Sequence, residues 1–590
     1  MNQKNEFGLL KNPTRYLFFT GKGGVGKTSL STAVALSLSD SGKSVLLVST
    51  DAASNLDEML GIKLSNQAVQ VPGAEKLFVL NIDPTMAAES YRKRVLEQMA
   101  DDATDAEKST VLEQLSGACT TEIAAFDEFS GQLVDDNSKY DHIIFDTAPT
   151  GHTIRLLSLP KAWTGFLKDN DQGASCLGPH SGLKMQEEKF QAALTALTDS
   201  SMTTVILVAR LDRGSIVEAN KTLLELRELG FKNQRLALNA IFHASNAEDS
   251  IAKSIEREGF KAIQEMPAAL KELPRDEIPL KGFDTVGLQS LRALLSITNP
   301  SNFTNAPKPT ATTLKIMGLD KLADQLAKNE RGLIMVMGKG GVGKTSVAAA
   351  LAIGLVQRGK SVHLNTTDPA AHLEMTLNGV VKDLVVGRID PIEETKKYVA
   401  KTMEQKGKNL NKAEKDLLFE DLKSPCTEEV AVFHAFSRVV SEARSSFVVL
   451  DTAPTGHSLL LMDATGAYHR QVMQDFKGKV TTPLMRIQDA DYTQIILVTL
   501  PEVTPVSQAA ALQEDLRRAK IEPYAWVINK SILMAGTTDP LLSNRLNGEQ
   551  RQIERIQAGL SHRLFSVPWL EKPPIGVDLL SRMVTGPGKE

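Results

Sequence analysis

Two identical octapeptides carry residue types suited to binding a nucleoside triphosphate. Gly21–Thr28 and Gly338–Thr345 both read Gly-Lys-Gly-Gly-Val-Gly-Lys-Thr and fit the phosphate-loop pattern G-x-x-x-x-G-K-[ST]. In such a loop, backbone N–H groups and the second lysine bind the phosphates, and the threonine hydroxyl binds Mg²⁺. We therefore predict two nucleotide sites. Their predicted binding residues are Gly21, Gly23, Gly24, Val25, Gly26, Lys27, Thr28 and Ser29, and Gly338, Gly340, Gly341, Val342, Gly343, Lys344, Thr345 and Ser346.

Four aspartates follow apolar runs and are candidates for the metal and for catalysis. Asp146 and Asp451 have the position of a Walker-B carboxylate, which holds Mg²⁺ directly or through water. Asp51 and Asp368 supply a second carboxylate in each copy, and we assign to them a share in the metal site and the orientation of the attacking water. The simpler alternative is that a strand-end aspartate only caps the following turn.

An additional lysine near the start of each loop is not needed for the local phosphate cradle. Lys22 and Lys339 hold this position. Such a lysine could reach a triphosphate across an interface, as arginine fingers do, or it could be an ordinary solvated lysine. Its recurrence in both copies favours the catalytic interpretation, so we count Lys22 and Lys339 with Lys27 and Lys344.

The three cysteines are candidate ligands for a soft, thiophilic ion. Cys119 and Cys426 occupy equivalent places in the two copies, and Cys176 lies in a segment that only the first copy has. Thiolates prefer soft ions, although a single buried cysteine is more often a small apolar residue. His152 and His457 also form an equivalent pair, each six residues after its Walker-B aspartate. The sequence Thr-Ala-Pro-Thr-Gly in between would link such a ligand to the magnesium site.

The copies extend far beyond the loops and indicate a duplicated chain. Asp368 follows Asp51 by 317 residues, Asp451 follows Asp146 by 305, and Asn529 follows Asn239 by 290. The order of the matches never changes, so the shrinking separation marks insertions in the first copy.

Short apolar runs alternate with helical stretches in each copy, and each phosphate loop follows such a run. This pattern predicts an α/β fold with two tandem P-loop NTPase halves, each a doubly wound, mostly parallel sheet, arranged as an intramolecular pseudo-dimer. The predicted domains are a first half at 1–297, a linker at 298–330 rich in Pro, Asn, Thr and Ser, and a second half at 331–590.

Composition narrows the function classes. The chain has 590 residues and a net charge of −4, with no run of basic and aromatic residues, so we expect no nucleic-acid partner. No apolar stretch approaches the roughly 20 residues that span a bilayer, and Met1–Arg15 does not resemble a signal peptide. Three cysteines favour a reducing compartment. We therefore expect a cytoplasmic protein.

The two loops, both Asp-Thr-Ala-Pro-Thr-Gly-His segments and the three cysteines together resemble the arsenical pump-driving ATPase family over nearly the whole chain. The resemblance implies hydrolysis of ATP with Mg²⁺, stimulated by As(III) or Sb(III), that energises a membrane arsenite efflux permease. It also implies a monomeric pseudo-dimer at the inner face of the plasma membrane and allows delivery of metalloid by a metallochaperone. Asn239 and Asn529 resemble the family's adenine-side residues. The implied metalloid ligands are Cys119, Cys176, Cys426, His152, His457 and, more weakly, Ser424.

One departure and two alternatives remain open at this point. Ala52 replaces the proline that the family usually has after Asp51, whereas Pro369 keeps it after Asp368, so the two sites could hydrolyse unequally. The first alternative is an ATPase that targets tail-anchored membrane proteins, which shares this loop. The second is a metalloid chaperone or buffer whose nucleotide sites only switch its affinity.

Overall fold

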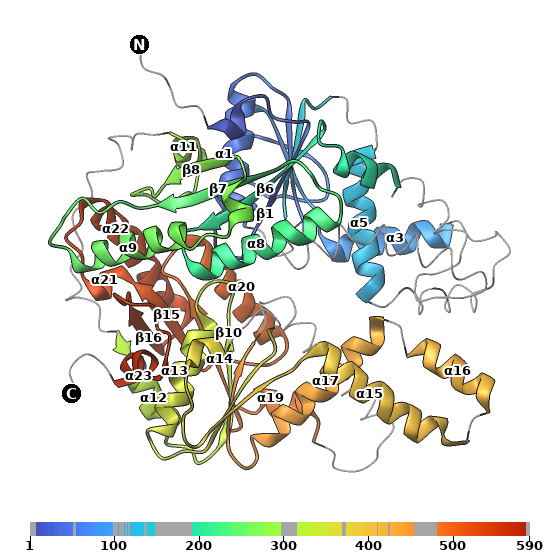
Figure 1. Ribbon diagram of the computed structural model, residues 1–590, viewed down its shortest axis with the longest axis vertical. Helices are drawn as coiled ribbons and strands as arrows, with labels where there is room; N and C mark the ends of the chain where they lie inside the picture. Colours follow the sequence, from blue (N-terminus) through green and yellow to red (C-terminus); the bar gives the residue numbers. More distant parts are fainter. Residues whose placement is uncertain are drawn as a thin grey trace. The chain divides into compact units, whose positions relative to one another are not determined.

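The chain forms two compact units in the computed structural model (Figure 1). One unit comprises Met1–Ala247 and Ile255–Asn305, and the other comprises Glu248–Ser254 and Ala306–Glu590. The structure describes residues 7–50, 55–97, 104, 111, 115, 118–134, 139–147, 191–296, 316–368, 373–409, 411–422, 425–452 and 481–585.

The first unit is built on an eight-stranded sheet in the order β3-β4-β2-β5-β1-β6-β7-β8. Its neighbouring strands pair in parallel except β3 and β4, which are antiparallel. The strands are β1 (Tyr16–Thr20), β2 (Val45–Ser49), β3 (Val69–Val71), β4 (Ala74–Asn81), β5 (His142–Asp146), β6 (Thr203–Arg210), β7 (Gln234–Ile241) and β8 (Arg275–Pro279). The helices are α1 (Lys27–Asp40), α2 (Leu56–Leu60), α3 (Pro84–Glu97), α5 (Ala118–Val134), α8 (Arg213–Glu228), α10 (Ala268–Lys271), α11 (Leu288–Leu294) and, from Ile255 onward, α9 (Ser250–Gln264).

Both faces of this sheet are covered, because alternate residues of a strand point to opposite sides. Along β1, Phe18 packs in a core with α5 and α8, and Leu17 and Phe19 pack in a second core with α1 and α11. The Phe18 and Phe145 rings stack with centroids 4.4 Å apart. Continuous burial of β1, β2 and β5 is typical of central parallel strands. The predicted doubly wound architecture is confirmed.

The second unit repeats this design with the strand order β12-β11-β13-β10-β14-β15-β16-β9. One core lies between the sheet and α12, α13 and α23, which pack side by side (Figure 1), and the other lies under α17, α20 and α22. The strands are β9 (Met317–Gly318), β10 (Gly332–Met337), β11 (Val362–Thr366), β12 (Leu384–Arg388), β13 (Phe447–Asp451), β14 (Thr493–Thr499), β15 (Ala525–Ser531) and β16 (Leu564–Pro568). The helices are α12 (Leu319–Leu326), α13 (Lys344–Val356), α14 (Leu373–Leu377), α15 (Pro391–Lys406), α16 (Lys412–Asp421), α17 (Pro425–Glu442), α19 (Pro483–Gln488), α20 (Val503–Arg518), α21 (Ile532–Ala535), α22 (Pro540–Arg555) and α23 (Val577–Thr585).

Part of the predicted linker is ordered structure of the second unit. Within 298–330, β9 pairs with β16, and α12 buries Leu319, Leu322 and Leu326. The Pro- and Thr-rich stretch 298–315 that suggested the linker lies outside the described residues. The position of the linker stays a prediction, and the predicted first half, 1–297, includes the segment Glu248–Ser254 that belongs to the second unit.

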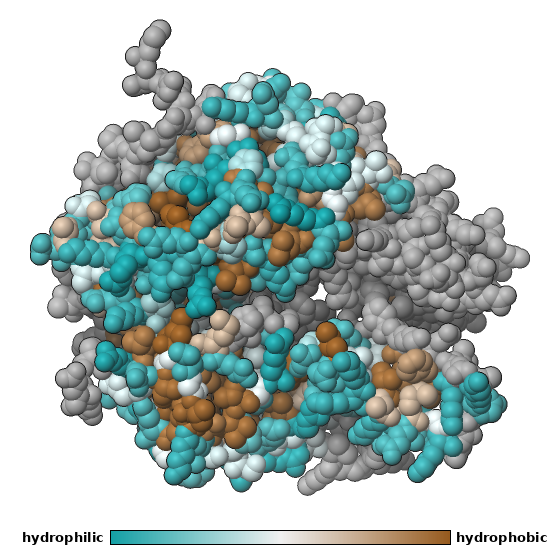
Figure 2. Space-filling view, viewed as in Figure 1, coloured by the Kyte–Doolittle hydropathy of each residue, from teal (hydrophilic) through white to brown (hydrophobic). Residues whose placement is uncertain are grey.

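The face drawn in Figure 2 carries both hydrophilic and hydrophobic residues. On the face in Figure 2, hydrophilic residues predominate over α8 and α9, with hydrophobic residues scattered among them. Among the helices that the structure describes, none is long and apolar enough to cross a membrane.

The second unit includes the short segment Glu248–Ser254, and Asp249 fastens it there. The Asp249 carboxylate accepts hydrogen bonds from the Thr537 hydroxyl and from the Thr538 and Asp539 backbone N–H groups, at 2.6, 2.6 and 2.9 Å. It also caps α9 by accepting from Ala252 N at 2.9 Å. Burial raises its pKa, but these hydrogen bonds outweigh burial and bring the pKa to about 2.

We expect Asp249→Asn to lower the midpoint of thermal unfolding by about 4–8 °C at pH 7, since losing charge-assisted hydrogen bonds costs about 2 kcal/mol. A depressed carboxyl pKa stabilises the fold above the unfolded pKa near 4 and ceases to do so as pH falls toward 2. The difference between variant and wild type should therefore shrink between pH 5 and pH 3. Calorimetry at several pH values measures it, and a constant difference would contradict this account.

Candidate nucleotide-binding sites

Each phosphate loop lies between a central buried strand and the first helix of its unit. β1 leads into the first loop and α1 starts at Lys27, while β10 leads into the second and α13 starts at Lys344. In both units the order of strands reverses at this point, β5-β1-β6 and β13-β10-β14. Ligands of doubly wound sheets bind at such a switch point, at the carboxyl ends of the strands.

An asparagine from the strand two places away holds each loop. Asn239 Nδ2 donates to Val25 O at 2.8 Å, and Asn529 Nδ2 donates to Val342 O at 2.9 Å. The loop glycines that follow, Gly26 and Gly343, have φ of 91° and 93°. A Cβ on either would lie 2.3 or 2.1 Å from the same asparagine nitrogen. Only glycine therefore fits the backbone conformation and the contact together.

A bulge in β7 and in β15 aims these asparagines at the loops. The pairing register shifts between Leu238 and Ile241 against β8, and between Ile528 and Ser531 against β16. The residue after each asparagine, Ala240 or Lys530, has a positive φ of 60° or 57°. Such a conformation is unfavourable for a non-glycine residue and persists where the surrounding structure imposes it. We predicted Asn239 and Asn529 as adenine-side residues, and the structure adds this contact with the loop.

The two loop lysines are buried and bind their own loops. Lys27 Nζ donates to Gly21 O at 2.9 Å and to Lys22 O at 3.3 Å, and Lys344 Nζ donates to Lys339 O at 3.1 Å. Their side chains are 6% and 5% exposed, which places an ammonium group inside each loop. Such a cation at the N-terminus of a helix provides a strong site for phosphate.

The Walker-B aspartate of the second unit lies within reach of the loop threonine. Asp451 Oδ2 accepts from Thr345 Oγ1 at 2.7 Å and from Thr366 Oγ1 at 3.3 Å. Its buried Oδ1 accepts no hydrogen bond from the described residues. Burial, with Asp368 nearby, raises the pKa of Asp451 to about 6, although Lys344 and Thr345 act against the rise. A buried carboxylate oxygen beside a hydroxyl fits Mg²⁺, which prefers oxygen ligands and would favour the ionised form.

The Walker-B aspartate of the first unit, Asp146, ends β5 and is completely buried. Its backbone carbonyl accepts from Thr50 N at 2.9 Å. The next residue, Thr147, donates its hydroxyl to Phe19 O, just before the loop, at 2.8 Å. Thr452 does the same to Val336 O in the second unit at 3.0 Å.

The sequence interpretation missed Thr147, Thr452 and Thr366. A signal for them existed, because all are hydroxyl residues at or next to the end of a buried strand. Thr147 and Thr452 tie each Walker-B segment to the strand that carries the loop, and Thr366 ties Asp451 to the end of β11.

The additional lysine of the first loop lies against its own unit. A Cβ built on Gly214, in the first turn of α8, would be 3.1 Å from Lys22 Nζ and 3.4 Å from the carboxylate of Asp212, which caps α8. The role of Lys22 and Lys339 across an interface stays a prediction.

The predicted metalloid ligands are described only in part. Cys119 is the second residue of α5 and Cys426 is the second residue of α17, which are equivalent positions in the two units. Their side chains are not among the described ones. Residues Asp51, Ala52, His152, Cys176, Pro369, Ser424 and His457 lie outside the described residues.

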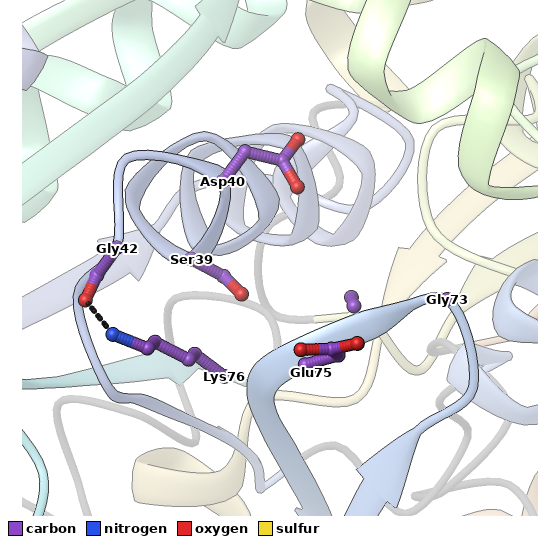
Figure 3. Close-up of a pocket in the computed structure, with 7 residues that line it drawn as sticks. Ser39, Asp40, Gly42, Gly73, Glu75 and Lys76 are labelled. Atoms are coloured by element: carbon purple, nitrogen blue, oxygen red, sulfur yellow. Dashed lines mark hydrogen bonds between the residues drawn. The ribbon is translucent and has the colours of Figure 1, made fainter.

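A cavity of about 350 Å³ lies at the C-terminal end of α1 (Figure 3). Ser39, Asp40 and Gly42 line it on one side and Glu75 and Lys76 on the other, with Lys76 Nζ bonded to Gly42 O. Ser39 and Asp40 are the last residues of α1, whose 14 residues span about 21 Å from the loop. The cavity is therefore separate from the nucleotide site.

Comparison with known proteins identifies relatives of the whole chain. The sequence profile of the anion-transporting ATPase family matches residues 14–298 and 331–486. An arsenical pump-driving ATPase of Escherichia coli is 51% identical over 98% of this chain and 99% of its own length. An arsenical pump-driving ATPase of Acidiphilium multivorum is 49% identical over 98% of this chain and all of its own length.

A more distant relative matches less than half of the chain. The ATPase GET3 of Komagataella phaffii is 28% identical over 47% of this chain and 88% of its own length. The first two relatives therefore match nearly the whole chain, and this third one matches less than half of it.

Proposed function

This chain belongs to the anion-transporting ATPase family, and we propose that it hydrolyses ATP in response to arsenite or antimonite and so energises a membrane arsenite efflux permease. The observation that carries the proposal is the identity of about half of all residues with arsenical pump-driving ATPases over 98% of the chain. The two equivalent loop sites agree with it. Each has a buried lysine, a glycine at positive φ and an asparagine that donates to a loop carbonyl.

Each site residue has a defined part in phosphoryl transfer under this proposal. Lys27 and Lys344 exchange their bonds to loop carbonyls for bonds to the nucleotide's phosphates. Thr28 with Asp146, and Thr345 with Asp451, would hold Mg²⁺, which would supply positive charge next to the phosphates. Asp51 and Asp368 orient the attacking water, and Lys22 and Lys339 add positive charge when nucleotide is bound.

We propose that metalloid controls hydrolysis through α5 and α17, each of which has a cysteine as its second residue. Cys119 and Cys426 would bind As(III) or Sb(III) together with Cys176, His152 and His457, with Ser424 as a weaker ligand. α5 packs under the sheet that carries Asp146, and α17 packs under the sheet that carries Asp451. A metalloid that fixes these helices thereby has a physical route to the Walker-B strands. Delivery by a metallochaperone and attachment to the permease at the inner membrane face belong to the same proposal.

Two alternatives predict different behaviour. A targeting factor for tail-anchored proteins would bind a hydrophobic helix in preference to metalloid; the partial match to GET3 gives it less support than the full-length matches give the pump. A nucleotide-switched metalloid chaperone would bind metalloid in fixed stoichiometry with negligible turnover.

We expect potassium antimonyl tartrate to raise the steady-state ATPase rate of the purified full chain several-fold, because the metalloid stabilises the arrangement that hydrolyses. Phosphate release measured with and without antimonite, with Mg²⁺ present, tests this. Zinc chloride at the same concentration serves as the control for unspecific thiol binding. An unstimulated rate would refute the pump proposal, and negligible turnover with tight metalloid binding would favour the chaperone.

A further inference from the structure

We propose that Glu549 is a positioning residue of the second nucleotide site, where it holds the turn from β15 into α21 (Ser531–Leu533) so that Asn529 stays on the phosphate loop. The inference rests on the proposed nucleotide site at Gly338–Thr345. It assigns a role to a helix, α22, that lies outside all the motifs of the sequence.

The Glu549 carboxylate binds three consecutive residues of this turn. It accepts from the Ser531 hydroxyl, from Ile532 N at 3.1 Å and from Leu533 N at 3.2 Å. Ser531 is fully buried and Glu549 is 6% exposed. A buried carboxylate with three donors fixes its partners firmly, because removing it would leave those donors unpaired away from water.

The fixed turn directly follows the bulge that aims Asn529. Ser531 is only two residues beyond Asn529, and Lys530 between them has the unfavourable φ of 57°. Asn529 Oδ1 accepts from Lys530 N at 3.0 Å while its Nδ2 binds Val342 O of the loop. If this turn were free to relax, Lys530 would leave its positive φ and the Asn529 side-chain amide would move away from Val342 O.

The first half has no carboxylate at the equivalent position. At the separation of 290 residues that relates Asn239 to Asn529, Glu549 corresponds to Gly259 and Ser531 corresponds to Ile241. The same separation relates Asp249 and Asp539, which cap α9 and α22. The equivalence of the helices therefore does not depend on the loop motif, and the support is specific to the second site.

The charge on Glu549 is sensitive to pH near neutrality. Burial raises its pKa to about 7, against the effects of Ser531, the backbone donors and Arg545. Arg545 of the same helix pairs with Glu502 at 3.3 Å, and Lys530, next to the turn, places its Nζ over the Trp569 ring. Charge-assisted hydrogen bonds are about twice as strong as neutral ones, so the ionised form holds the turn better.

The test compares ATP affinity at each site in the full chain by titration calorimetry. Lys27→Gln disables the first site, and in that background we expect Glu549→Gln to weaken ATP binding roughly 5- to 10-fold at pH 8. Lys344→Gln disables the second site, and there Glu549→Gln should leave affinity within about 2-fold. Glu554→Gln is the matched control, because Glu554 is an exposed glutamate of the same helix bonded only to Gln550 among the described residues.

A pH series separates positioning from general stability. The loss caused by Glu549→Gln should shrink from pH 8 to pH 6, as the wild-type carboxyl becomes protonated. Ser531→Ala, which removes one donor, should give a smaller loss with the same pH trend. Equal losses in both lysine backgrounds, or no loss with Lys27→Gln, would overturn the proposal. Absence of any ATP binding to the Lys27→Gln chain would refute the second nucleotide site and the proposal with it.

Discussion

Gly343→Ala should reduce ATP affinity at the second site by about 100-fold, equivalent to about 2.7 kcal/mol. The new Cβ would lie 2.1 Å from Asn529 Nδ2, so the amide must leave Val342 O, and alanine at a φ of 93° adds backbone strain. Both effects fall on the loop that binds the phosphates. Titration of the Lys27→Gln chain with and without this substitution measures the effect.

Gly42 provides a closely matched control for Gly343. It has the same φ of 93°, but a Cβ there would meet only Lys76 Nζ at 3.9 Å, near the distant end of α1. Gly42→Ala should therefore lower stability while ATP affinity stays within about 2-fold. Similar losses of affinity in both variants would show that strain alone matters and that the contact with Asn529 does not.

Cys119→Ser should raise the antimonite concentration needed for half-maximal stimulation of the ATPase by at least about 100-fold, and Cys426→Ser should do the same. A serine hydroxyl is a much poorer ligand than a thiolate for a soft ion, and loss of even an outer-shell partner costs 10- to 100-fold in metal affinity. The two cysteines hold equivalent positions in α5 and α17, so their effects should be similar. Phosphate release over an antimonite series gives the value.

Ala118→Ser, one residue earlier in α5, controls for a polar substitution at the start of this helix. It should leave the antimonite response unchanged. If Cys119→Ser responds to antimonite like the wild type, the metalloid does not bind through this cysteine and the assignment of the three-thiol site is wrong.

The sequence was sufficient for the architecture, because the duplicated apolar runs coincide with central strands. Two of the apolar runs, Leu46–Val48 and Val205–Val208, fall inside β2 and β6, and the helical stretches that follow the loops are α1 and α13. These elements are buried on both faces, so local pattern and tertiary environment agree. The edges were less predictable, since β3 is antiparallel and β9 is only two residues long.

The support around the loops could not be read from the sequence, because it depends on contacts between distant positions. Asn239 was noticed only through its repetition as Asn529, and nothing local signals a bulge followed by Ala240 at positive φ. Glu549 looks like an ordinary helix glutamate until the fold turns it toward Ser531. Burial of a single carboxylate is a property of the tertiary structure, whereas the octapeptide is a property of the chain.

The contacts of Gly26 with Asn239 and of Gly343 with Asn529 also limit which substitutions each half can accept in evolution. A larger residue at either glycine would require a smaller one at its asparagine, and that change by itself would leave a loop carbonyl unbound. Neither partner can change alone without loss, so the pair is expected to be inherited as a unit. Exchanging the identical octapeptides between the halves would alter nothing in a chimera. The two sites differ instead in the residues at the ends of β7 and β15 and in the helices α9 and α22 that follow these strands.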